Sequence, residues 1–308
     1  MTTMTTTTMT TTTMTTMTTT AMTTTKPMSD AGHRVPTPAD VPGRAGELLA
    51  SLGDRAVLCD LYDAVGATVY HDLAGTGTHE VRELLALVRR IPGDVLDLAA
   101  GSGRLTLPLL ALGRQVTALE LSSYMLELLD QRLAAAPPAL RARCLPVRAD
   151  MSAFDLGRRF GAIVLGTTTI SLLDAEGRTG LYRAVREHLE PGGRFLLSTV
   201  DMAATGEGAA EVDMEIVTDS GRAYRLFEHW TPDSGSRTVT LFPAGLGELG
   251  ELGDEGPVQV CTTTIGVLPV ELLEAELAAA GFSVRSRHPL PAVGERHHDV
   301  LLETEVTP

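Results

Sequence analysis

The chain has 308 residues, 44% of them hydrophobic, which is enough apolar material for one large α/β domain or two smaller ones. Its formal net charge is −14, from 39 acidic and 25 basic residues, whereas a nucleic-acid-binding protein would carry a basic surface. No run of about 18 apolar residues occurs, so a membrane span is excluded. Three cysteines, odd in number and far apart, argue against a disulfide framework and for the reducing cytoplasm. The histidines lack metal-site spacing, and we expect no metal.

Residues 1–28 differ from the rest of the chain. Eighteen of them are Thr and seven are Met, with no apolar periodicity. Such a segment cannot bury enough surface to offset its chain entropy, so we expect it to be disordered. A translation start at or near Met28 is the alternative to a functional tail.

Helices and strands are expected to alternate between residues 40 and 200. Residues 46–74 have helical periodicity, which predicts an N-terminal helical lid over residues 40–78, and an amphipathic helix follows at 78–90. Beyond it lie short apolar strands at 94–99, 115–121, 142–147, 162–166 and 194–200, separated by helices at 104–112, 122–135 and 174–189. This alternation predicts right-handed crossovers and an α/β fold with a doubly wound parallel sheet.

The pattern changes to a period of two in residues 205–267. Four segments there are joined by Gly, Asp and Ser turns, which predicts an antiparallel subdomain: 211–217, 222–230, 237–242 and 258–267. A helix at 269–280 and strands at 282–288 and 299–306 then complete the α/β domain, whose two parts are residues 79–204 and 268–308. Because insertions at the carboxyl ends of parallel strands usually set ligand selectivity, we expect this insert to cover that edge of the sheet, with an oligomerisation element as the alternative.

The turn after the first strand of the sheet carries two glycines, in the segment VLDLAAGSGR. Glycines there let the backbone approach a ligand closely, and the helix that follows offers free N–H groups. A dinucleotide-binding fingerprint would need a third glycine where Thr106 stands. Instead, Asp97 stands four residues before Gly101, and two more acids, Glu120 and Asp150, follow the next two strands.

An acid followed by this Gly-x-Gly spacing is the first motif of class I S-adenosylmethionine (SAM) methyltransferases, and residues 79–200 resemble that family. The resemblance implies a Rossmann-like SAM-binding sheet, with Glu120 at both ribose hydroxyls, Asp150 beside the adenine amino group and a turn at residues 190–193 (EPGG). The family usually has Phe-Asp where this chain has Phe160-Gly161. The cofactor-binding residues implied are Tyr70, Asp97, Ala99, Gly101, Gly103, Arg104, Glu120, Leu121, Met125, Asp150, Met151 and Leu165.

Segments outside this core resemble bacterial natural-product N-methyltransferases. The surroundings of Tyr62 and Tyr70, and the pair His229-Trp230, are similar to those of amino-sugar N-methyltransferases. Residues 62–66 and 99–121 are more similar in sequence to the methyltransferases of daptide-type ribosomal peptide pathways. That resemblance implies methylation of an amine, to the dimethyl form, on a modified peptide terminus. The implied partner is a small-molecule or peptide amine, with a biosynthetic complex and a homodimer left open.

Methyl transfer to a neutral amine needs alignment more than a strong base. Two histidines, His71 and His229, are the candidate weak bases. The acceptor-side candidates are Tyr62, Thr168, Ser171 and Trp230, and we expect the insert to turn His229 and Trp230 toward the acceptor. An O- or C-methyltransferase on the same scaffold, and a catalytically silent SAM-binding partner, are the competing functions.

Overall fold

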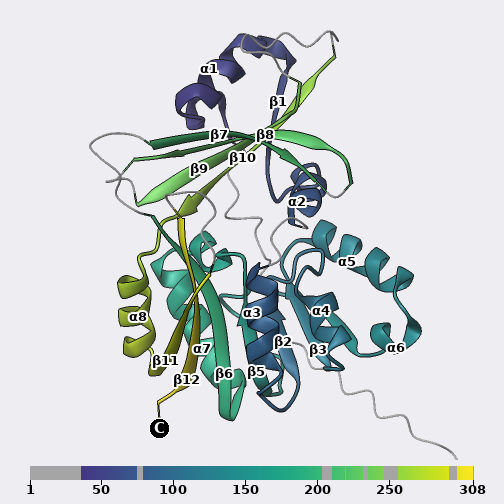
Figure 1. Cartoon of the computed structure of the whole chain (residues 1–308), viewed down its shortest axis with the longest axis vertical. Helices are drawn as coiled ribbons and strands as arrows, with labels where there is room; N and C mark the ends of the chain where they lie inside the picture. The colour runs from purple at the N-terminus through teal and green to yellow at the C-terminus, as the bar shows by residue number, and fades with distance from the viewer. Residues whose placement is uncertain are drawn as a thin grey trace, which may run out of the picture. The chain divides into compact units, whose positions relative to one another are not determined.

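The computed structural model describes residues 36–74, 79–202, 210–218, 220–231, 235–245, 256–290 and 297–307. The disorder expected for residues 1–28 lies outside this part of the chain. The described strands form a seven-stranded sheet, here called the large sheet, and a five-stranded one, the small sheet (Figure 1). Within the described residues, no helix has the length and apolar character needed to cross a membrane.

The large sheet has the strand order β11-β12-β6-β5-β2-β3-β4. Its strands are β2 (Val95–Leu98), β3 (Val116–Glu120), β4 (Cys144–Arg148), β5 (Phe160–Leu165), β6 (Leu189–Met202), β11 (Phe282–Pro289) and β12 (His297–Val306). Strands β4, β3, β2, β5 and β6 are parallel, and β12 runs antiparallel to β6 and β11. The doubly wound α/β fold is therefore confirmed. Its strand order reverses between β2 and β5, and ligands of such sheets bind at the carboxyl ends beside that point.

Helices cover both faces of the large sheet (Figure 1). One face packs against α3 (His79–Val88), α4 (Thr106–Ala111) and α5 (Ser123–Ala135), and the other against α7 (Ala175–His188) and α8 (Val270–Ala279). Alternate residues of a strand serve the two cores, since Val95 packs with the α3 side and Leu96 and Leu98 with the α7 side. Ser122 caps α5, as predicted. Shorter elements are α6 (Pro138–Arg141) and the 3-10 turn η3 (Thr169–Leu172).

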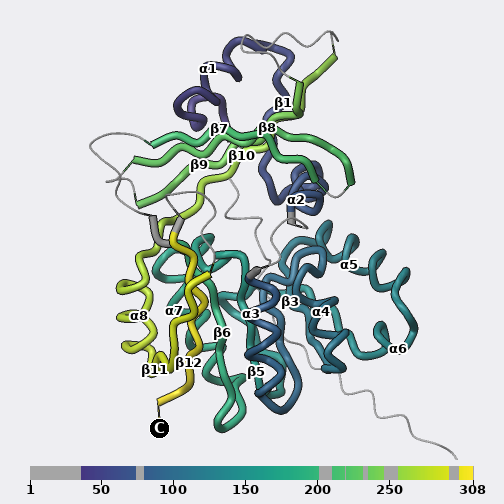
Figure 2. Tube along the Cα trace, viewed as in Figure 1, coloured from purple at the N-terminus to yellow at the C-terminus, as the bar shows by residue number. Residues whose placement is uncertain are grey.

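The small sheet has the strand order β1-β10-β9-β8-β7. Its strands are β1 (Ala56–Asp60), β7 (Ala210–Val217), β8 (Ala223–Trp230), β9 (Ser236–Pro243) and β10 (Val258–Gly266). The four strands of the insert pair antiparallel, as their alternation predicts. One face packs against α1 (Gly43–Leu52), and α2 (Gly66–Ala74) packs on the other (Figure 2). Two 3-10 turns, η1 (Pro38–Asp40) and η2 (Gly53–Arg55), flank α1.

The N-terminal segment is not wholly helical, contrary to the sequence-based expectation for residues 46–74. Residues 56–60 form β1, which pairs in parallel with β10. This segment is apolar, and its backbone N–H and C=O groups pair with those of β10, which lies about 200 residues later in the chain. The N-terminal segment and the insert thus share one sheet.

Two further expectations need correction. The expected turn at residues 190–193 lies within β6, which begins at Leu189, and the register between β5 and β6 shifts between Phe160 and Ala162 to accommodate it. The cysteines are not all far apart in space, because the Sγ atoms of Cys59 and Cys261 lie 3.0 Å apart across β1 and β10. Both are free thiols.

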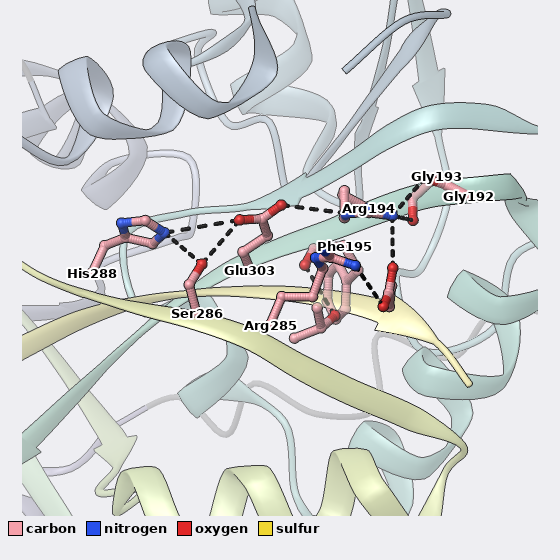
Figure 3. Close-up of polar contacts among 10 residues, drawn as sticks. Gly192, Gly193, Arg194, Phe195, Arg285, Ser286, His288 and Glu303 are labelled. Carbon is pink, nitrogen blue, oxygen red and sulfur yellow. Dashed lines mark hydrogen bonds and ion pairs between the residues drawn. The ribbon is translucent and has the colours of Figure 1, made fainter. Parts of the chain in front are cut away.

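The β11–β12–β6 end of the large sheet carries a polar network, shown in Figure 3. Arg194 Nε donates to Glu303 Oε1 over 3.3 Å, and Ser286 Oγ donates to Glu303 Oε2 over 2.9 Å. His288 approaches both Ser286 and Glu303 through the same nitrogen, Nε2, at 2.8 and 4.0 Å. A relay triad would use the two ring nitrogens of the histidine separately, so this cluster is a cross-strand network that pairs charges on partly exposed strands.

Candidate active site

A pocket opens where β2 and β5 end, at the reversal point of the large sheet. The loop after β2 supplies most of its wall, and the end of β5 and helix α2 supply the rest. The lining residues are Tyr70, Asp97, Leu98, Ala99, Ala100, Gly101, Ser102, Arg104, Leu105, Gly166 and Thr167. Five of the expected cofactor-binding residues, Asp97 among them, are thus brought together here.

The backbone around this pocket is held in unusual conformations. Ala99, Thr167 and Thr168 have φ angles of 49°, 59° and 54°, and they are the only non-glycine residues with positive φ in the described residues. Left-handed backbone is costly for residues with a Cβ, and such strain concentrates at ligand sites. Gly101 has φ 55°, and a Cβ built on it would meet no atom within 4 Å, so the space beside its Cα is open to a ligand.

Asp97 lies at the buried end of β2 on the floor of the pocket. Its side chain is 1% exposed, and Thr106 Oγ1 donates to its Oδ2 over 2.6 Å. Burial is the main cause that raises the pKa of Asp97 to about 7, against a smaller opposing effect of the Thr106 hydrogen bond. A cation beside this carboxyl would favour its ionised form.

Glu120, the acid that ends β3, ties the pocket loop to helix α5. Its Oε2 accepts from the N–H of Gly101 over 2.9 Å, and its Oε1 accepts from the N–H of Ser122 over 2.8 Å. Burial raises the pKa of Glu120, while these backbone hydrogen bonds lower it. A carboxylate has lone pairs beyond those two bonds, so it can also accept from two hydroxyls of a ligand.

Sequence reasoning missed Glu80, a residue of the first turn of α3. It forms an ion pair with Arg104, and its Oε1 accepts from the N–H of Thr167 over 2.7 Å and from Ser198 Oγ. The carboxylate therefore holds together the loop after β2 and the strained loop after β5. An acid in the first turn of a helix is common, so no local pattern distinguishes Glu80 from a solvent-exposed residue.

Helix α2 connects this pocket to the small sheet. Tyr70 lines the pocket and packs against Tyr62, with ring centroids 5.3 Å apart. His71 Nδ1 lies 2.7 Å from Ser102 Oγ, and burial lowers the pKa of this histidine. Asp72 accepts from Tyr224 Oη of β8 over 3.0 Å. The aromatic pair and the histidine thus lie between the pocket and the face of the small sheet that α2 covers, here called the inner face.

The two members of the His229-Trp230 pair lie on opposite faces of the small sheet, so the expectation that both turn toward the acceptor is wrong. His229 lies on the α1 face, where its Cδ2 would be 2.9 Å from a Cβ on Gly43. Trp230 lies on the other face, buried with Val200 of β6 and Ala210. Consecutive residues of a strand alternate between faces, and that rule makes His229 unsuitable as a base for this pocket.

The remaining candidates are not among the residues that line the pocket. Gly103 lies close to α5, because a Cβ at this position would be 2.6 Å from Leu129 Cδ1. The absence of a side chain at Gly103 therefore lets the loop pack against that helix. Asp150 accepts from the N–H and hydroxyl of Ser152. Ser171 is buried in η3, and its hydroxyl has no partner in the structure. Leu121 is exposed, Met125 and Leu165 are buried, and Met151 is partly buried against the core on the α7 side.

Comparison with known proteins agrees with this arrangement. A family profile described as a methyltransferase domain matches residues 95–193. The structure of the glycopeptide N-methyltransferase MtfA complexed with SAM is 38% identical, with a TM-score of 0.60, and the match covers 87% of this chain and 98% of that one. The chain belongs to the SAM-dependent methyltransferases. SAM is its cofactor, and it is a methyltransferase of the natural-product type.

Two other solved structures share the fold of this methyltransferase at lower identity. The CcbJ methyltransferase from Streptomyces caelestis is 22% identical, with a TM-score of 0.65 over 81% of this chain and 99% of that one. CalS10, an amino pentose methyltransferase from Micromonospora echinaspora, is 21% identical, with a TM-score of 0.56 over 77% of this chain and 96% of that one. Both matches extend over most of the described chain, so the small sheet belongs to the shared fold.

The pocket of the methyltransferase has the chemistry that SAM requires. SAM carries an ammonium group, a ribose with two hydroxyls and a sulfonium. The pocket offers a buried carboxyl at Asp97, a second at Glu120 behind Gly101, and open space beside the Gly101 backbone. Buried carboxyls without a bound cation are costly, and their raised pKa values record that cost.

Proposed function

We propose that this methyltransferase transfers methyl groups to an amine of a modified ribosomal peptide of the daptide type. The observation that supports a peptide amine as acceptor is the likeness to a glycopeptide N-methyltransferase, 39% identical and matched over 99% of its length. A match of that extent includes the small sheet as well as the cofactor domain, so the part expected to select the acceptor is also alike. The amino pentose methyltransferase CalS10 is less similar, at 21% identity, which favours a peptide acceptor over a sugar. The daptide type rests on the resemblance of residues 62–66 and 99–121.

We assign the cofactor contacts by the chemistry of each group. Glu120 accepts from the ribose hydroxyls, Asp97 pairs with the ammonium group, and the Gly101 backbone lies against the ligand. We assign Asp150, which follows β4, and Leu121, which follows β3, to the adenine side. When bound, SAM supplies a methyl group that its positive sulfur makes electrophilic.

The residues of the chain itself supply orientation and exclusion of water. In the proposed arrangement, residues 40–78 and 205–267 together cover the pocket, and Tyr62, Thr168 and Ser171 line the acceptor side. In this arrangement the partly buried Tyr62–Tyr70 pair keeps water from the reacting atoms. Holding an amine in line with the methyl carbon can supply about 7–11 kcal/mol of barrier reduction by proximity alone.

The cofactor assignment is tested by calorimetric titration of SAM into the purified protein. Glu120→Ala should weaken SAM binding by about 1.5–3 kcal/mol, because a charge-assisted hydrogen-bond acceptor is lost. Glu127→Ala is the matched control, since it removes an exposed acid from α5, the helix that follows Glu120. Equal affinities for wild type and Glu120→Ala would refute the assignment.

The acceptor is tested with labelled SAM and matched amine and hydroxyl compounds. The amines are trialanine, trialanine with a C-terminal propanediamine amide, and D-glucosamine; their partners carry a hydroxyl in place of the amine. We expect transfer to a peptide amine, with one or two methyl groups detected by mass spectrometry. Preferred transfer to a hydroxyl compound would favour O-methylation, and transfer only to D-glucosamine would favour an amino-sugar acceptor.

A further inference from the structure

An ion pair with little exposure to solvent lies against the wall of the cofactor pocket. Glu80 of α3 pairs with Arg104, and the two side chains are only 12% and 14% exposed. Arg104 lines the pocket, and so does Gly166, the glycine that follows β5. A Cβ built on Gly166 would lie 3.1 Å from Glu80 Oε1 and 3.4 Å from Arg104 Nη2. Both charges therefore lie directly beside the backbone that forms this wall.

The carboxylate of Glu80 is held in one orientation by three donors. Its Oε1 accepts from the N–H of Thr167 over 2.7 Å and from Ser198 Oγ over 2.5 Å, while its Oε2 faces Arg104. Ser198 Oγ in turn accepts from the N–H of Thr168 over 3.1 Å. Arg104 also donates to the hydroxyl of Thr167. This network fixes both residues of the left-handed turn after β5, and Arg104 is a part of it.

The charges of this pair act in opposite directions on two residues that line the pocket. Burial is the main cause that raises the pKa of Tyr70, followed by the charge of Arg104, which lowers it, and that of Glu80, which raises it. The pKa of Asp97 is likewise raised mainly by burial, lowered by Arg104 and raised by Glu80. Inside the pocket, the carboxylate of Glu80 thus offsets the positive charge of Arg104.

A positive side chain at the wall of this pocket is unfavourable for a cationic ligand. SAM carries a positively charged sulfur, and its product S-adenosylhomocysteine (SAH) lacks only the methyl group and that charge. An uncompensated guanidinium would repel the sulfonium of SAM but not the neutral sulfur of SAH, so it would favour the product over the cofactor. Arg104 can hold the turn after β5 without this cost only if a carboxylate compensates its charge.

We propose that Glu80 is a positioning residue that compensates the charge of Arg104 at the pocket wall and thereby raises the preference of the pocket for SAM over SAH. The consequence for turnover is weaker competition by the product. This role depends on the cofactor and not on the class of acceptor. The two ligands share every group except the methyl and the charge at sulfur, so the ratio of their dissociation constants isolates the effect of that charge.

The test is calorimetric titration of the purified protein with SAM and, separately, with SAH. Glu80→Gln keeps the size of the side chain but removes its charge, so SAM binding should weaken relative to SAH binding by roughly 5- to 20-fold, the scale of one partly screened unit charge. Glu80→Asp keeps the charge and should change this ratio by less than about twofold. Because both ligands are titrated into the same preparation, a misfolded fraction alters the stoichiometry and not the ratio of dissociation constants.

The variant Arg104→Met should give a change of the opposite sign. It leaves the negative charge of Glu80 uncompensated, so it should shift the ratio toward SAM. The double variant Glu80→Gln with Arg104→Met removes both charges and should return the ratio to within about twofold of wild type. An unchanged ratio in Glu80→Gln would refute the proposal, and so would a changed ratio that the double variant does not restore.

The matched control is Glu83→Gln. Glu83 belongs to the same helix, its side chain is 40% exposed, and it pairs with Arg82 at 3.5 Å. Its substitution should leave both affinities unchanged, because an exposed charge is screened by solvent. Failure to methylate any amine would refute the acceptor class proposed above and leave this proposal standing, because none of these titrations contains an acceptor.

Discussion

The two sheets of this methyltransferase differ in the side chains that their faces carry. Both faces of the large sheet are covered by apolar layers, and the acids of its pocket, Asp97 and Glu120, lie at the carboxyl ends of its strands. The face of the small sheet that α1 covers combines apolar residues with the Asp213–Arg225 ion pair, and the face that α2 covers carries the Glu228–Arg237 pair, aromatic residues and two thiols. Helices cover both faces of a parallel sheet, so a ligand reaches only the ends of its strands. A second sheet beside those ends can present a whole face to the ligand.

The largest effect should come from the residue that joins the two sheets. Trp230 is buried against Val200 of the large sheet, so Trp230→Ala should lower the free energy of unfolding by about 3–5 kcal/mol. Denaturant titration measures this, and Trp230→Phe should recover much of it. A loss of acceptor turnover at unchanged stability would instead show that Trp230 contacts the substrate.

Among the pocket residues, we expect SAM affinity to be most sensitive to substitution of Gly101. Because this glycine has φ 55° and faces the pocket, Gly101→Val should weaken SAM binding by about 100-fold or more, from strain together with steric exclusion. Gly113 also has positive φ (84°) with open space beside it, and it does not line the pocket. Gly113→Val therefore carries the strain alone, and calorimetry should give wild-type SAM affinity for it.

Asp97 should make both the stability of the fold and the affinity for SAM depend on pH. Its pKa is raised from 3.8 to about 7, so the neutral form stabilises the fold, and its contribution is lost as the pH rises from about 4 through 7. SAM, through its ammonium group, should favour the ionised form, so affinity should fall by roughly 15-fold between pH 7 and pH 5.5, a range in which the ammonium stays protonated. Titrations in buffers of different ionisation enthalpy should detect a released proton, and Asp97→Asn should remove it.

The smallest effect is expected from residues 1–27, which belong to neither sheet. A tract of Thr and Met has no amphipathic face to pack, so its deletion should leave the melting temperature and the SAM affinity unchanged. A drop of several degrees in a thermal melt would show that the segment docks on the folded part.

The cofactor edge was predictable because its signals are local. Asp97, Gly101 and Glu120 follow consecutive strands at characteristic spacing, and apolar periodicity defined the strands themselves. Glu80 and Glu228 were not predictable, because a carboxylate in a helix or strand resembles any surface residue until the tertiary fold gives it partners. β1 was missed for a related reason, since its partner strand lies far along the chain. The separation of His229 from Trp230, in contrast, could have been deduced from the period of two.

The pairing of β1 with β10 has a consequence for synthesis. Cys59 meets its partner Cys261 across 202 residues, so β1 leaves the ribosome long before any strand exists to satisfy its edge. At translation rates of about 5–20 residues per second, that interval is roughly 10–40 s. During it the nascent chain carries an unpaired apolar strand edge, the kind of surface that chaperones bind and that aggregation exploits. Yield during expression should therefore depend more on β1 than its five residues suggest.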